Sequence, residues 1–185
     1  TSMCYPVSSM GSHVSVVPNH QLNRKTPLHT RANVAYFGTF GYELDLNKLS
    51  DEEISEVKQQ ITFMKEYREL IQFGTFYRLK SPFEGNETAW MTVSEDKKTA
   101  LVFWYRERNV VNADFTRVRL QGLDPDFIYR NEYNETENYG DELMNLGLLT
   151  TDCTAGEPTS EDEPCTDYES RIYVLTTVAR IPSPL

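Results

Sequence analysis

Acidic side chains that stand close together in the sequence are the first candidates for chemistry, because paired carboxylates serve as general acid and base. Glu43 and Asp45 lie two residues apart, Asp141 and Glu142 are adjacent, and Asp124 precedes a proline. Each falls where a turn or a helix cap is expected, and turns and caps use Asp and Glu to bind the backbone. We therefore interpret these carboxylates as structural, because the sequence shows no pair held face to face.

The sequence has few features of cysteine-based or phosphate-binding sites. The three cysteines, Cys4, Cys153 and Cys165, have neither metal-ligand spacing nor the density of a disulfide framework. Cys153 and Cys165 bracket an acidic stretch that should be a solvated loop; they either pair or stay free in a reducing cytosol, and the second alternative is favoured. No nucleophile elbow or phosphate loop occurs, so a complete small enzyme of another class is not supported. No metal or cofactor is expected.

The overall composition excludes several partners. The chain has 185 residues, a net charge of -10 and 39% hydrophobic residues, so it should fold but should repel nucleic acids. Its longest apolar run, residues 100–105, is too short to span a bilayer, so no membrane partner is expected. No secretory signal is recognised, which favours the cytoplasm. In the alternative, a secreted protein, the glycosylation triplets at Asn86 and Asn134 would matter.

Residues 1–74 have mainly helical patterns. The apolar stretch from Met3 to Val7 predicts the end of a buried strand, and a loop rich in Ser, His and Asn follows it. Thr26 before Pro27 predicts the start of a helix that ends near residue 38. A second helix should start at Ser50, which forms a capping box with Glu53. Its buried stripe is Ile54, Val57, Ile61, Met64, Tyr67 and Ile71, and Gly74 should end it.

From residue 75 the pattern changes to short alternating strands. Strands are predicted around 76–79, 89–93, 101–105, 115–120, 127–129 and 172–178, with turns at 95–98 and 122–125. Short strands at this spacing predict an antiparallel sandwich. Trp104 lies in an apolar run and should be in the core. Trp90 lies on the opposite strand face from Ala89 and Met91, so it stays a candidate for stacking on a sugar.

An ordered set of short motifs resembles one enzyme family. These motifs include 10–15 (MGSHVS), 17–21 (VPNHQ), 26–28 (TPL), 40–46 (FGYELDL), 72–74 (QFG), 76–79 (FYRL), 89–90 (AW), 93–96 (VSED), 122–125 (GLDP) and 139–144 (YGDELM). Together they are similar to the C-terminal third of the glycoside hydrolase family 36 α-galactosidases. The stretches at 22–25 and 153–165 depart from the family's usual pattern.

The resemblance implies an α+β fragment. Residues 1–74 would be the last strand and two helices of a catalytic (β/α)8 barrel, with the strand near Met3 to Val7. Residues 75–185 would be the C-terminal antiparallel β-sandwich domain. The chain then begins in mid-sequence, within a longer parent enzyme.

The resemblance also implies the reaction of the parent. Retaining glycosidases use two carboxyl groups about 5–5.5 Å apart, one as nucleophile and one as acid and base. In the family both aspartates lie upstream of this stretch, so we assign no catalytic residue to the chain and expect it to be inactive by itself. Ser9, Ser12 and His13 would lie near the barrel rim, where substrates bind. They are the candidate sugar contacts, against the alternative that they only bind loop backbone.

Two functions remain open. The first is a structural fragment of an enzyme that removes terminal α-galactosyl residues from oligosaccharides such as melibiose and raffinose, with a homo-oligomeric parent. The alternative is a stand-alone carbohydrate-binding or interaction module. The amphipathic helix after Ser50 argues against this alternative, because a binding module needs no apolar stripe that faces a missing partner.

Overall fold

The computed structural model describes residues 2–110, 115–150 and 167–180. The chain divides into two compact units, Thr1–Gly74 and Thr75–Leu185, and each is described by itself. The question of a pair between Cys153 and Cys165 lies outside the described residues.

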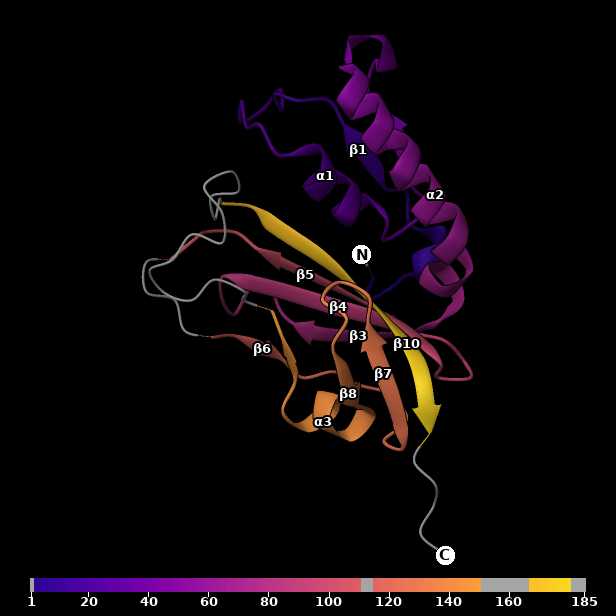
Figure 1. Cartoon of the computed structure of the whole chain (residues 1–185). Helices are drawn as coiled ribbons and strands as arrows, with labels where there is room; N and C mark the ends of the chain where they lie inside the picture. The colour runs from indigo at the N-terminus through magenta and orange to yellow at the C-terminus, as the bar shows by residue number, and fades with distance from the viewer. Residues whose placement is uncertain (1, 111–114, 151–166, 181–185) are drawn as a thin grey trace, which may run out of the picture. The chain divides into compact units, whose positions relative to one another are not determined.

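The first unit joins two short parallel strands through a helix (Figure 1). β1 (His13–Ser15) pairs with β2 (Gly41–Glu43), and Val14 stands opposite Tyr42. α1 (Leu28–Ala35) lies between them in the chain, as a parallel connection requires. Val14 and Ala32 are fully buried. Two 3-10 turns, η1 (Val7–Ser9) and η2 (Leu46–Lys48), complete the unit together with α2 (Asp51–Phe73).

The capping box at the start of α2 is confirmed. The Ser50 hydroxyl accepts a hydrogen bond from the Glu53 N–H at 3.2 Å, and the Glu53 carboxylate accepts one from the Ser50 N–H at 2.9 Å. The predicted stripe is also the buried side of the helix, because Val57, Met64 and Ile71 are at most 7% exposed. Lys58, Gln59, Lys65, Glu66 and Glu69 are exposed.

Two local predictions in the first unit were wrong. No strand forms at Met3 to Val7: residues 2–5 form turns, Met3 is 79% exposed, and the first strand among the described residues is β1. The apolar composition of that stretch misled because its proline and turn conformation keep it from pairing. The residue that caps α1 is Pro27, not Thr26. By contrast, Gly74 ends α2 as predicted, and its backbone conformation is extended.

The second unit is built on a six-stranded antiparallel sheet. The strand order is β3-β4-β5-β10-β7-β8, and the long strand β10 lies between β5 and β7 (Figure 1). The bounds are β3 (Thr75–Lys80), β4 (Glu87–Val93), β5 (Thr99–Arg106), β7 (Phe127–Asn131), β8 (Glu137–Tyr139) and β10 (Glu169–Arg180). The central position of β5 explains why every residue from Ala100 to Trp104 is fully buried.

A smaller layer packs on one face of this sheet. It consists of the strand pair β6 (Arg117–Val118) and β9 (Leu148–Leu149), and of the short helix α3 (Gly140–Asn145). Val118, Leu143 and Leu148 share one apolar core with Met91 and Trp104 of the sheet. The predicted α+β class, with an antiparallel sandwich after the helices, is therefore confirmed.

Two predictions in the second unit can be refined. The strand expected over 115–120 is reduced to β6, and Leu120 reaches the core from the loop that follows. The predicted turn at 122–125 contains Gly122 with a φ of +75°, and a Cβ there would lie 2.3 Å from the Tyr77 hydroxyl. Only glycine fits this backbone position without strain.

Candidate functional site

The three residues predicted at the barrel rim lie in one segment but have different roles. Ser9 is exposed, and its hydroxyl donates a hydrogen bond to the Pro6 carbonyl at 2.9 Å within η1. Ser12 is half-buried beside Gly38, where an added Cβ would come within 2.8 Å of the Ser12 Cβ. His13 opens β1 with its side chain 56% exposed. Ser9 therefore contacts loop backbone, as in the alternative interpretation, whereas the His13 side chain is exposed.

The parallel register brings a carboxylate to His13. Its Nδ1 lies 4.0 Å from a carboxylate oxygen of Glu43, which is 75% exposed. An ion pair forms there only when the imidazole is protonated, and an exposed pair of this kind contributes little to stability. This geometry separates Glu43 from the other acidic candidates, because it is the one that faces a predicted rim residue.

The remaining acidic candidates act in caps and turns. The Asp45 carboxylate caps η2 by accepting the Asn47 N–H at 3.0 Å, and this hydrogen bonding lowers the pKa of Asp45. The Asp124 carboxylate accepts the Asp126 N–H at 3.0 Å. The Asp141 carboxylate accepts the Glu142 N–H in the first turn of α3. Their interpretation as structural residues agrees with these contacts.

The loop after β1 is organised by a residue that the sequence analysis did not single out. The side-chain oxygen of Asn19 accepts the N–H groups of Gln21 and Leu22, both at 3.0 Å, and its N–H donates to the Arg24 carbonyl. Asparagine is common in such turns, because its short side chain can take the place of a backbone hydrogen-bond acceptor.

A buried polar relay supports β2 from the side of α2. The Tyr42 hydroxyl donates to the Gln60 side-chain oxygen at 2.8 Å, and the Gln60 amide donates to the Glu56 carboxylate at 2.7 Å. Burial raises the pKa of Tyr42 to about 12, so it stays a neutral donor at physiological pH. Gln60 is only 6% exposed, and the relay satisfies its polar atoms, as a buried amide requires.

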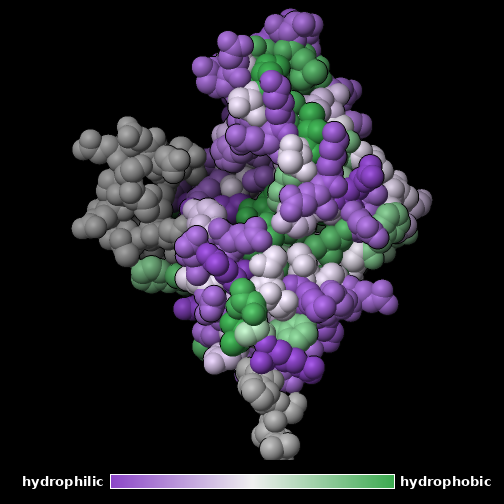
Figure 2. All heavy atoms as spheres, turned by 45° about the vertical axis from the view of Figure 1, so that its right-hand side comes forward, coloured by the Kyte–Doolittle hydropathy of each residue, from purple (hydrophilic) through white to green (hydrophobic). Residues whose placement is uncertain are grey.

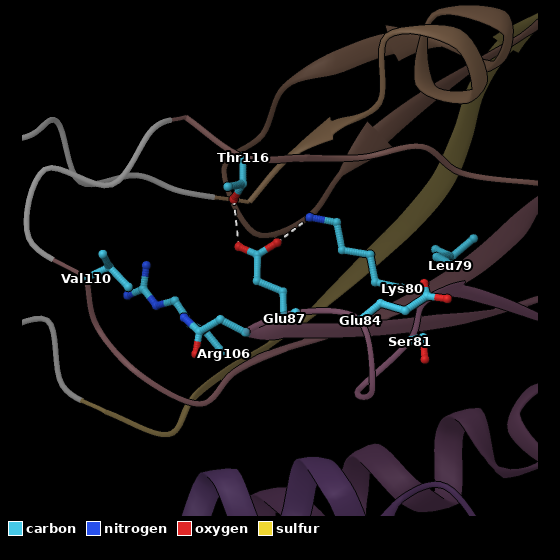
Figure 3. A pocket seen from close by; sticks show the side chains of 10 residues that line it. Leu79, Lys80, Ser81, Glu84, Glu87, Arg106, Val110 and Thr116 are labelled. Atoms are coloured by element: carbon cyan, nitrogen blue, oxygen red, sulfur yellow. Dashed lines mark hydrogen bonds and ion pairs between the residues drawn. The ribbon is translucent and has the colours of Figure 1, made fainter.

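A pocket of about 510 Å³ opens in the second unit. It is lined by residues of the β3–β4 hairpin together with Arg106, Val110 and Thr116. Figure 3 shows the side chains of Lys80 and Glu87 pointing toward each other, with Thr116 on the far side of the Glu87 carboxylate. Lys80 forms an ion pair with Glu87, and the Thr116 hydroxyl donates to the other carboxylate oxygen at 2.8 Å.

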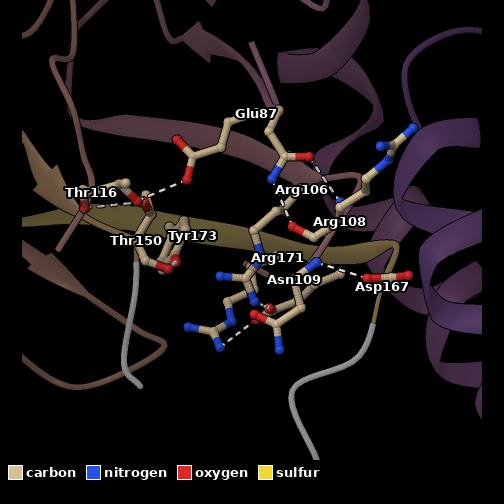
Figure 4. Close-up of polar contacts among 11 residues, drawn as sticks. Glu87, Arg106, Arg108, Asn109, Thr116, Thr150, Asp167, Arg171 and Tyr173 are labelled. Atoms are coloured by element: carbon tan, nitrogen blue, oxygen red, sulfur yellow. Dashed lines mark hydrogen bonds and ion pairs between the residues drawn. The ribbon is translucent and has the colours of Figure 1, made fainter. Parts of the chain in front are cut away.

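Polar contacts continue from this pocket into the sheet (Figure 4). The Thr116 and Thr150 hydroxyls lie 3.1 Å apart, and the Tyr173 hydroxyl donates to the Thr150 carbonyl at 3.4 Å. Asn86 also lines the pocket, and its amide group exchanges two hydrogen bonds with the backbone of Arg108, at 2.6 and 2.9 Å. These contacts fix the mouth of the pocket between two segments that are distant in the sequence.

Arg106 belongs to a second ionic cluster. Its guanidinium pairs with Glu169, whose other carboxylate oxygen accepts from Arg171 at 2.6 Å. Both guanidinium groups also lie over the Trp104 ring, at 5.5 and 5.9 Å from its centre. Trp104 is fully buried, as predicted, whereas Trp90 is half-buried and its ring contacts that of Tyr105 in a tilted arrangement, with the ring centres 4.7 Å apart. That contact gives Trp90 a structural role within the sheet.

No pattern in the sequence predicted the pocket of the second unit. Lys80, Glu87 and Arg106 were not singled out, because their partners come from other strands and no local motif marks them. The alternation of β4 did carry a signal, since Glu87 falls on the same strand face as Ala89 and Met91 and is therefore a charge at the end of a core-facing row.

Metal-ligand clusters and membrane-spanning helices were sought among the described residues. Within residues 2–110, 115–150 and 167–180 no three His, Cys, Asp or Glu side chains gather as metal ligands would. None of the helices in the same ranges has both the length and the apolar character needed to span a bilayer. Hydrophilic side chains cover most of the face shown in Figure 2.

Comparisons with known proteins cover both units. The Melibiase family model matches residues 1–74, and the model of the glycosyl hydrolase family 36 C-terminal domain matches residues 87–175. α-Galactosidase AgaA of Geobacillus stearothermophilus is 53% identical over 148 residues, which are 80% of this chain and 20% of that protein. α-Galactosidase Mel36A of Lactobacillus acidophilus is 48% identical over 148 residues, again 80% of this chain and 20% of that protein. The chain thus spans about a fifth of these relatives.

Solved structures give the same result. The crystal structure of AgaA matches with a TM-score of 0.86 and 46% identity, over 96% of this chain and 23% of that one. The α-galactosidase of Lactobacillus brevis matches with a TM-score of 0.87 and 41% identity, over 98% of this chain and 24% of that one. The resemblance found in the sequence motifs is confirmed, and the chain belongs to glycoside hydrolase family 36.

Proposed function

We propose that this chain is the C-terminal part of a retaining α-galactosidase that hydrolyses terminal α-galactosyl residues of oligosaccharides. The observation that carries the proposal is the continuous match to α-galactosidases across both units, at 41–46% identity to solved structures. Crystal structures of AgaA variants hold raffinose and stachyose. We propose oligosaccharides of the raffinose and melibiose type as the substrates of the parent enzyme.

In this proposal the first unit completes a catalytic barrel and the second supports it. Parallel strands joined through a helix, as in β1–α1–β2, are the repeating element of a (β/α)8 barrel. The six-stranded sheet and its smaller layer form the C-terminal domain. Both catalytic aspartates lie in the preceding part of the parent, so the isolated chain binds no substrate in a reactive pose. No cofactor takes part.

The test is hydrolysis of p-nitrophenyl α-galactoside by this chain and by a longer protein extended upstream through the barrel. We expect turnover by the longer protein and none by the chain alone. Turnover by the chain alone would mean that its own carboxylates catalyse. Inactivity of the longer protein toward α-galactosides, with binding of sugars retained, would instead support the carbohydrate-binding module.

We further propose that His13 and Ser12 contact or support the sugar at the barrel rim, and that Ser9 supports the loop beneath them. His13 is exposed at the start of β1, and Glu43 stands 4.0 Å away to orient its imidazole. In the longer protein we expect His13→Ala to lower kcat/KM by about tenfold through the loss of one polar contact. His20→Ala is the matched control, because His20 is also an exposed histidine. Equal kinetics for the two variants would rule out a role for His13.

We also propose a compartment and an assembly state for the parent enzyme. Cys4 is a free, exposed thiol, which suits the reducing cytoplasm better than a secreted location. The side chain of Asn86 is engaged on both amide atoms, so its glycosylation would disrupt the fold around the pocket. We propose a cytoplasmic, homo-oligomeric parent, and light scattering of the longer protein gives its subunit number.

A further inference from the structure

The pocket of the second unit carries balanced charge. Lys80 and Arg106 contribute two positive charges to its lining, and Glu84 and Glu87 contribute two negative ones. The Glu169–Arg171 pair next to Arg106 adds no net charge. An anion in this pocket would face two carboxylates, and a cation would face two basic groups. The charge balance therefore favours a neutral ligand that carries both hydrogen-bond donors and acceptors.

The pocket also keeps hydrogen-bonding capacity that the protein does not use. Both carboxylate oxygens of Glu87 are occupied, by Lys80 and Thr116. The Lys80 ammonium has three N–H donors, and its side chain is 31% exposed. Arg106 is 7% exposed, and among the described residues its Nε–H meets no hydrogen-bond acceptor. Leaving such a buried donor unsatisfied costs free energy, which a polar ligand beside it would recover after a small shift.

An exposed aromatic ring stands on the loop that forms the rim. Phe83 is 95% exposed, and its neighbours Ser81, Glu84 and Gly85 line the pocket. The loop is held in a turn, because the Ser81 hydroxyl accepts the Phe83 N–H at 3.3 Å and the Ser81 carbonyl accepts the Glu84 N–H at 3.3 Å. Phe83 thus presents a solvent-facing ring on the loop that borders a pocket of about 510 Å³, and this volume lies in the range of ligand sites.

We propose that this pocket of the C-terminal domain binds a neutral carbohydrate, with one hexopyranosyl ring stacked on Phe83 and its hydroxyl groups bound by Lys80, Glu84 and Arg106. Vicinal hydroxyls both donate and accept, so they match the mixed lining. The site performs no chemistry and goes beyond the proposed activity. It would hold a glycan near the enzyme rather than cleave it. The bound sugar comes either from the enzyme's own α-galactosides or from another hexopyranoside.

The test is a titration of the ¹⁵N-labelled chain, followed by two-dimensional NMR. The probes are methyl α-galactoside, methyl α-glucoside and raffinose, with inorganic phosphate and acetate as anions. We expect the neutral sugars, at millimolar concentration, to shift the amide signals of Gly85, Asn86 and Glu87. Preference for the galactoside and raffinose would identify the enzyme's own substrates as the source, and equal shifts with the glucoside would identify a general hexopyranoside site.

Two exposed substitutions keep the test independent of folding. Phe83→Ala should weaken sugar binding about tenfold, because it removes the stacking surface. Glu84→Ala should weaken it about threefold, because it removes one acceptor. Tyr5→Ala and Glu95→Ala are the matched controls, since both residues are exposed and neither lines the pocket. The controls should bind as the unchanged chain does.

Three results would overturn the proposal: no shift with any neutral sugar, shifts with the anions alone, or full binding by Phe83→Ala. Because binding is measured without turnover, each of these results leaves the proposed α-galactosidase activity untouched. Loss of activity in the longer protein, in turn, says nothing against sugar binding here.

Discussion

Replacing Glu169 by Leu is expected to lower the free energy of unfolding of the second unit by about 3–5 kcal/mol, because it leaves buried positive charge without its partner. Glu169 accepts from Arg106 and Arg171 with opposite carboxylate oxygens. The side chains of the three residues are only 7–18% exposed. Urea unfolding followed by tryptophan fluorescence measures the change, since both tryptophans, Trp90 and Trp104, lie in this unit.

An exposed ion pair of the same sheet provides the control. Arg130 and Glu135 are 3.2 Å apart, but their side chains are 45% and 78% exposed. Glu135→Leu should therefore cost less than about 1 kcal/mol. In addition, the double variant Arg106→Met with Glu169→Leu should lose less than the sum of its single variants, since the two sites interact. Additive losses, or similar losses for Glu135 and Glu169, would show that the buried cluster does not act as a unit.

Trp104→Ala is expected to have a comparable effect, again about 3–5 kcal/mol, because a fully buried indole is replaced by a cavity. Trp104 is a residue of β5 that is 0% exposed, and it belongs to the core that joins the sheet to the smaller layer. The guanidinium groups of Arg106 and Arg171 also lose the ring over which they lie. The fluorescence of Trp90 remains available to follow unfolding.

Phe83→Ala is the control for this second prediction. The ring is 95% exposed, so its removal should change the free energy of unfolding by no more than about 0.5 kcal/mol. This variant also carries the sugar-binding test, and an unchanged stability would show that any loss of binding is local. A loss below about 1 kcal/mol for Trp104→Ala would mean that the core tolerates the cavity, contrary to its close packing.

Both substitutions would change the surroundings of Arg106, which lines the pocket. Arg106 is shared between the ionic cluster with Glu169 and the lining of the pocket. Its guanidinium is held by the ion pair with Glu169 and by its position over the Trp104 ring. Because these contacts limit its motion, binding of a ligand by Arg106 would need only a small shift and little loss of side-chain entropy.

The local elements and the family could be predicted from contiguous stretches of sequence. Ser50 and Glu53 are three residues apart and meet within one helical turn, so the capping box could be read directly. The apolar stripe of α2 and the run around Trp104 are likewise set by period and composition. The ordered motifs predicted family 36 for the same reason, since each motif is contiguous and needs no knowledge of distant contacts.

Which charged side chains pair with one another depends on contacts between distant segments. Lys80 and Glu87 pair across the β3–β4 hairpin, Thr116 reaches Glu87 over 29 residues, and Arg106 reaches Glu169 over 63. Such contacts depend on strand order and register, which the alternation of a single strand does not specify. The error at Met3 to Val7 has the same origin: apolar composition shows what a segment prefers to bury, but pairing with β2 is achieved by His13–Ser15. Elements follow from local interactions, whereas the pocket follows from the way the sheet brings distant segments together.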